Sequence, residues 1–106
     1  IHVRDISKAF IHCIKNFNNM KNEIYNVGLS SANLSKTELC VQIKEIINDF
    51  NFKDIGGAKD PDRRNYVVSN KKIENTGFKT DWTLKRGIKE LIKGYEMINN
   101  RRYGNV

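Results

Sequence analysis

The chain is poor in the residues that punctuate or cross-link proteins: its 106 residues include one proline, two cysteines and one tryptophan. Two cysteines cannot form the dense disulfide framework of a small secreted domain, and they pair with neither histidine at zinc-ligand spacing. No apolar run approaches the length of a membrane span, and no segment resembles a signal peptide. We therefore expect no metal, no membrane partner and a cytoplasmic location, with Cys13 and Cys40 as buried free thiols.

Positive charge exceeds negative charge, with 19 lysines and arginines against 12 aspartates and glutamates, for a net charge of +7. Such a charge attracts nucleotides, nucleic acid or anionic surfaces without choosing among them. Acidic and basic residues alternate along the chain without a long block of one sign, which is typical of a solvated surface with a basic bias.

Hydrophobic periodicity predicts three long helices. Asp5 stands at the expected N-cap of the first. Ser35 and Glu38 have the spacing of a capping box at the start of the second, and Thr83 precedes the third. The three helices are expected over residues 5–17, 35–50 and 83–98.

Two short apolar runs and one short helix complete the predicted elements. The runs Glu23–Gly28 and Arg64–Val68 are rich in β-branched and aromatic residues, and both indicate strands. A short helix is expected to start at Ser69 or Asn70 and to end at Gly77 in the left-handed region. The sequence thus predicts an α/β fold with three long helices, one short helix and two short strands. One domain covers residues 1–98, and a frayed tail covers residues 99–106.

The order of these motifs resembles the C-terminal part of extended short-chain dehydrogenases/reductases, the family of nucleotide-sugar epimerases and dehydratases. The resemblance covers nearly all of residues 1–98. The matching pieces are Ile1-His2-Val3-Arg4-Asp5-Ile6 before an amphipathic helix, Glu23-Ile24-Tyr25-Asn26-Val27-Gly28, the capped helix at Ser35, the segment 62–73, Gly77-Phe78 and the helix start at 83–88.

The resemblance implies a fragment that packs on a Rossmann domain lying outside this sequence. That domain would bind NAD or NADP, supply the Tyr-x-x-x-Lys pair and form the homodimer of the full-length enzyme. None of the four tyrosines here is followed by a lysine four residues on, and no glycine-rich phosphate loop is present. We therefore expect this chain to bind no cofactor and to catalyse nothing alone.

The resemblance also implies that the chain holds the nucleoside diphosphate of a nucleotide sugar. By its position relative to Tyr66, Arg64 matches the family arginine that contacts the diphosphate, with Arg63 as a second contact. An alternative alignment places Lys59 at that arginine and Asp62 at an aspartate that meets a ribose hydroxyl. A planar guanidinium can make two charge-assisted hydrogen bonds to phosphate oxygens, which favours Arg64.

Two other classes of function remain open. In a nucleic-acid-binding module, Arg63 and Arg64 would form a phosphate track with Arg101 and Arg102. The aromatic residues fall mostly at core-type positions, which argues against nucleic acid. A bare protein-interaction domain would show no preference for anions.

Three conspicuous side chains are expected to be structural. His2 and His12 have no acid or nucleophile at motif spacing, so neither is expected to be catalytic. Trp82 precedes a helix cap and is expected to anchor the turn at Phe78.

Overall fold

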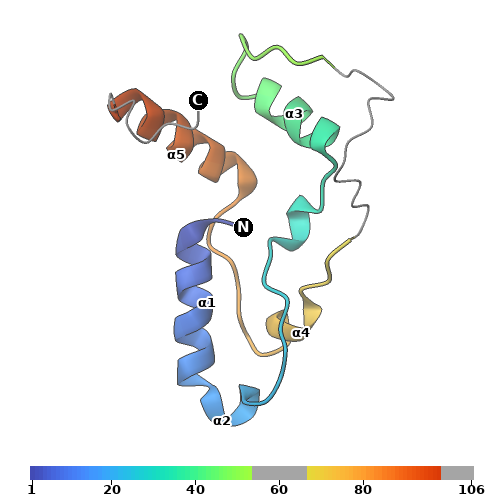
Figure 1. The fold of residues 1–106 in the computed structure, drawn as a ribbon, viewed down its shortest axis with the longest axis vertical. Helices are drawn as coiled ribbons and strands as arrows, with labels where there is room; N and C mark the ends of the chain where they lie inside the picture. Colours follow the sequence, from blue (N-terminus) through green and yellow to red (C-terminus); the bar gives the residue numbers. More distant parts are fainter. Residues whose placement is uncertain (54–66, 99–106) are drawn as a thin grey trace.

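The computed structural model describes residues 1–53 and 67–98, and the only regular secondary structure within these residues is helical (Figure 1). The elements are α1 (Val3–Lys15), α2 (Phe17–Met20), the 3-10 turn η1 (Ser30–Ala32), α3 (Lys36–Lys44), α4 (Lys71–Glu74) and α5 (Leu84–Met97). The predicted α/β fold is wrong, because the described part of the chain is a small helical domain without strands.

Side chains, rather than a backbone ladder, hold the segments expected to be strands. Lys72 Nζ donates to the Glu23 carboxylate at 2.7 Å and to the Ile24 carbonyl at 2.9 Å. The Asn33 amide exchanges two hydrogen bonds with the backbone of Val68, at 3.0 and 3.1 Å. A strand needs a neighbouring backbone for its ladder, and the apolar pattern at 23–28 does not reveal whether one is present. Residues 64–66 of the second predicted strand lie outside the described residues.

The first predicted helix, over residues 5–17, corresponds to α1, which ends at Lys15, and a separate short helix, α2, begins at Phe17. Asn16 separates them: its backbone N–H and its side-chain amide both donate to the His12 carbonyl, at 3.0 and 2.8 Å. At the other end, the N-cap is His2, whose Nδ1 accepts the Arg4 N–H at 3.2 Å. The assignment of Asp5 as N-cap is wrong, because Asp5 is buried inside the first turn.

The other predicted helix starts are confirmed. Ser35 and Glu38 form the complete capping box of α3, and the Thr83 hydroxyl accepts the Arg86 N–H at the start of α5. Helix α3 stops at Lys44 instead of continuing to residue 50. Gly77, at φ 90°, ends the turn after α4 in the left-handed region as predicted.

The core joins α1, α2, α4 and the turn that follows α4. Its buried side chains are Ala9, Met20, Ile73 and Phe78, with Cys13, Tyr25 and Val27 packed around them. Both cysteines are free, and both are only partly buried, contrary to the expected full burial. Helix α3 packs beside α5, away from this core (Figure 1).

None of the helices in residues 1–53 and 67–98 combines the length and apolar character that crossing a membrane requires.

Candidate functional site

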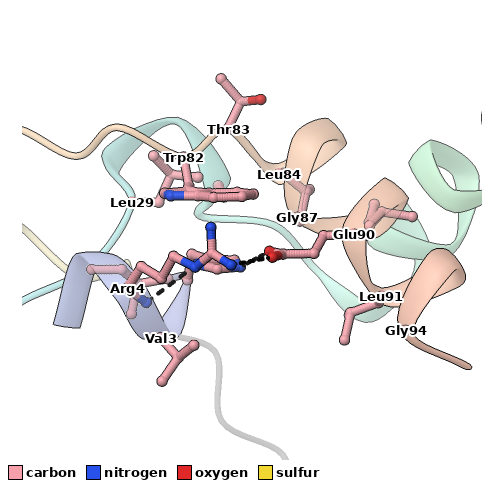
Figure 2. A pocket seen from close by; sticks show the side chains of 14 residues that line it. Val3, Arg4, Leu29, Trp82, Thr83, Leu84, Gly87, Glu90, Leu91 and Gly94 are labelled. Atoms are coloured by element: carbon pink, nitrogen blue, oxygen red, sulfur yellow. Dashed lines mark hydrogen bonds and ion pairs between the residues drawn. The ribbon is translucent and has the colours of Figure 1, made fainter. Parts of the chain in front are cut away.

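A cleft of about 550 Å³ lies between the first turn of α1, the η1 segment and α5 (Figure 2). This volume falls in the range of small-molecule sites. Its wall is mostly apolar, with Ile1, Val3, Leu29, Leu84, Ile88 and Leu91 contributing side chains. The charged side chains in its lining are Arg4 and Glu90, which point toward each other below the Trp82 ring in Figure 2.

Trp82 forms one wall of the cleft and is held by stacking. The His2 ring lies parallel to the indole, with 4.0 Å between ring centroids and 9° between planes. The guanidinium carbons of Arg86 and Arg4 lie 3.9 and 5.0 Å from the indole centroid, within cation–π range. We expected Trp82 to anchor the Phe78 turn, but its ring instead packs against His2 and these two arginines.

The buried carboxylate of Asp5 fixes the backbone that carries Trp82. It accepts the N–H of Asp81 at 2.9 Å and the N–H of Trp82 at 3.1 Å. Only 1 % of Asp5 is exposed, so these two bonds replace the water that the carboxylate loses on folding. Asp5 therefore joins the first turn of α1 to the residues that precede α5.

The two polar groups of the first turn converge on one carboxylate of α5. His2 Nε2 lies 2.6 Å from Glu90 Oε2, and Arg4 Nη2 lies 2.9 Å from Glu90 Oε1. Since His2 Nδ1 accepts the Arg4 N–H, the ring proton is assigned to Nε2, which donates to Glu90. Both carboxylate oxygens are thus bound, each by a different donor.

Helix α5 carries two glycines, Gly87 and Gly94, on the side that lines the cleft. A Cβ at Gly94 would meet no atom within 4 Å, and one at Gly87 would touch only the His2 ring, at 3.6 Å. Glycine within a helix costs about 1 kcal/mol relative to alanine. Packing in the described structure does not require Gly94, and its main local effect is to leave the cleft open.

A second polar cluster positions the loop that brings Leu29 to the cleft. The Asn70 side chain is buried against Gly28, where a Cβ would come within 2.9 Å of its Oδ1. Its Nδ2 donates to the Ser30 hydroxyl, which in turn donates to Glu74, whereas Oδ1 lacks a hydrogen-bond partner. This cluster ties the loop to α4, and we assign it a structural role.

Two glutamates have a lowered pKa, and neither lines the cleft. The pKa of Glu23 is lowered by its hydrogen bond to Lys72 and by the charge of that lysine. The pKa of Glu38 is lowered by the Ser35 N–H and then by the Ser35 hydroxyl, both of which hydrogen-bond within the capping box. Both carboxyls are exposed, so the shifts reflect local pairing of the kind found throughout protein surfaces.

The residues predicted to bind diphosphate, Arg64, Arg63 and Asp62, lie outside the described residues, as does Lys59 of the alternative alignment. His12 has the structural role expected of it: its Nε2 is bonded to the Thr76 hydroxyl at 2.8 Å. The sequence reasoning missed Arg4 and Glu90. Their positions two residues after His2 and four residues after Arg86 were visible, but the contact between the two helices was not.

A scan of the sequence against protein-family models finds no match. Within residues 1–53 and 67–98, no three histidine, cysteine, aspartate or glutamate side chains gather as a metal site requires.

Proposed function

We propose that this chain binds the nucleoside diphosphate of a nucleotide sugar, as the substrate-binding portion of a larger NAD(P)-dependent epimerase, dehydratase or reductase. In this proposal Arg64 contacts the diphosphate, with Arg63 and Asp62 beside it. The cofactor and the catalytic residues come from the other portion. The order of the sequence motifs supports the choice of enzyme family.

The observation that carries the proposal is an apolar stripe on the outer side of α1. Val3, Phe10 and Ile14 recur at helical spacing, and Phe17 continues the line into α2. We call these four residues the outer stripe. Their exposed fractions are 71, 69, 74 and 62 %, respectively.

The inner side of α1 is the more polar one. It presents Asp5 to the residues before α5 and His12 to Thr76, with Ala9 between them in the core. A helix of a self-sufficient domain normally buries its apolar side. Two consecutive helices that turn four large apolar side chains outward fit a chain that packs against another folded unit.

The test uses the polypeptide that carries this chain. We expect it to bind NAD or NADP and a nucleotide sugar, and we expect Arg64→Ala to raise the KM for the nucleotide sugar at least tenfold. Loss of a bidentate, charge-assisted contact has this magnitude. The Kd for the cofactor should stay unchanged, since the cofactor site lies in the other portion.

Lys85→Ala is the matched control, because it removes one positive charge from an exposed position of α5. An equal effect of both substitutions would contradict a specific contact by Arg64. Salt-dependent binding of duplex DNA at physiological ionic strength, without binding of nucleotide sugars, would favour the nucleic-acid alternative instead.

A further inference from the structure

We propose that the cleft between α1 and α5 binds a small apolar carboxylate, and that Glu90 occupies the carboxylate position when the cleft is empty. The inference does not depend on the proposed function.

The donors at the mouth of the cleft are spaced for one carboxylate. Arg4 Nη2 and His2 Nε2 each reach a different oxygen of Glu90, at 2.9 and 2.6 Å. Hydrogen bonds of this kind are short and directional, and two of them fix the orientation of a carboxylate. The Glu90 side chain therefore marks where the carboxylate of a ligand fits.

The body of such a ligand would lie along the apolar wall. Leu29, Leu84 and Leu91 line the cleft, and Gly94 leaves open space on α5 beside them (Figure 2). A ligand chain can approach the helix backbone at Gly94, whereas the His2 ring lies over Gly87, 3.6 Å from the position of a Cβ there. An apolar tail would remain in contact with this wall while its carboxylate faces Arg4.

Glu90 can give way at modest cost. Its side chain is 37 % exposed and that of Arg4 is 65 % exposed, so solvent screens this ion pair and its net contribution is small. A ligand carboxylate would also take over the hydrogen bond from His2, whose side chain is 17 % exposed. Arg86 lies one turn earlier on α5, at a spacing that lets its guanidinium pair with the displaced carboxylate of Glu90. The His2 ring stays in place because Trp82 stacks on it.

The test compares octanoate with 1-octanol, which share an apolar chain and differ in charge. Trp82 is the only tryptophan and lines the cleft, so its fluorescence reports binding directly. Glu90→Gln keeps the size of the side chain and removes its charge. It should strengthen octanoate binding up to about fivefold, as expected for loss of a solvent-exposed competing ion pair, and leave octanol binding unchanged. Arg4→Gln should weaken octanoate binding alone.

Gly94→Leu should block both ligands, because Gly94 lines the cleft and a leucine side chain there would fill space that the ligand needs. The substitution should not disturb the fold, since a Cβ at Gly94 meets no atom within 4 Å. Gly94→Ala is the matched control and should retain binding. Far-UV circular dichroism establishes that each variant is folded.

Three results would overturn the proposal. One is the absence of octanoate binding to both the unmodified chain and Glu90→Gln. Another is weaker octanoate binding in Glu90→Gln, which would make Glu90 a structural partner of Arg4. The third is an equal gain for octanol, which would mean that the cleft takes any apolar chain without recognising a carboxylate.

Discussion

Asp5 connects two parts of the chain that are 76 residues apart, through its bonds to the backbone of Asp81 and Trp82. Asp5→Asn would present an amide NH₂ group to one of these N–H donors and leave that donor without an acceptor. We expect a loss of about 1–3 kcal/mol in the free energy of unfolding, the usual cost of a buried unpaired polar group. Denaturant titration followed by Trp82 fluorescence measures it.

The control for this prediction is Asp49→Asn, at an exposed position after α3. It should change the free energy of unfolding by less than about 0.5 kcal/mol. If both variants lose the same stability, the buried hydrogen bonds of Asp5 contribute no more to the free energy of unfolding than an exposed carboxylate does.

At the residue scale, local chemistry was predictable and distant partners were not. The capping roles of Ser35 and Thr83 follow from residues within one helical turn, and both are confirmed. Asp5 is also of a residue type that is favoured at N-caps, but its carboxylate accepts hydrogen bonds from the backbone N–H groups of residues 81 and 82. His2 takes the cap instead. A preference for caps gives no information about a competing partner elsewhere in the chain.

Helix α3 offers a pH-dependent prediction, because its capping box involves an ionised group. Hydrogen bonds from Ser35 lower the pKa of Glu38 in the folded chain. The cap is therefore fully formed above the ordinary glutamate pKa of about 4.3 and is lost as the pH falls through the lowered value. We expect the helical ¹³Cα shifts of the first turn of α3 to decline with a midpoint below pH 4.3.

Glu38→Gln should abolish this transition, and Ser35→Ala should move its midpoint upward by removing one of the two bonds. Glu45→Gln, at the opposite end of α3, is the matched control and should leave the transition in place. A transition that survives in Glu38→Gln would have to come from another carboxyl, contrary to the assignment.

At the element scale, helix starts were more predictable than strands. A helix satisfies its backbone internally, so periodicity and caps identify it from one stretch of sequence. The run 23–28 has strand composition, but a strand also needs a second backbone beside it. In the described structure, Lys72 and the Asn33 side chain supply the contacts to these segments. The sequence could not show that side chains would take the place of a ladder.

Apolar side chains lie both in the buried core and on the exposed outer stripe, and this gives a prediction for the whole molecule. Phe10→Gln with Ile14→Gln removes half of the outer stripe, whose side chains have few contacts within the chain. We expect the free energy of unfolding to change by less than about 1 kcal/mol. Self-association at high concentration, measured by sedimentation velocity, should decrease because less apolar surface is exposed.

Ile73→Ala provides the contrast, because Ile73 is 1 % exposed in the core. It should cost about 2–5 kcal/mol. A comparable loss in the double variant would place the outer stripe inside the folded unit, which would remove the main support for a partner domain.

At the same scale, the cleft could not be predicted. Its lining comes from both ends of the described chain, with His2 and Glu90 88 residues apart. Each residue has an unremarkable local context: a histidine before a helix, and a glutamate on a solvent-facing helical surface. Only the approach of α1 to α5 gives them a common role.

This separation along the chain has a consequence for synthesis. Asp5 leaves the ribosome well before its partners at residues 81 and 82, because 76 residues lie between Asp5 and Asp81. At about 5–20 residues per second, the delay is about 4–15 s. During that time the Asp5 carboxylate is hydrated by water and lacks the two backbone partners that it has in the folded chain. A nascent chain halted before residues 81 and 82 would therefore lack the link between the first turn of α1 and the start of α5, whereas its outer stripe would be exposed both before and after that link forms.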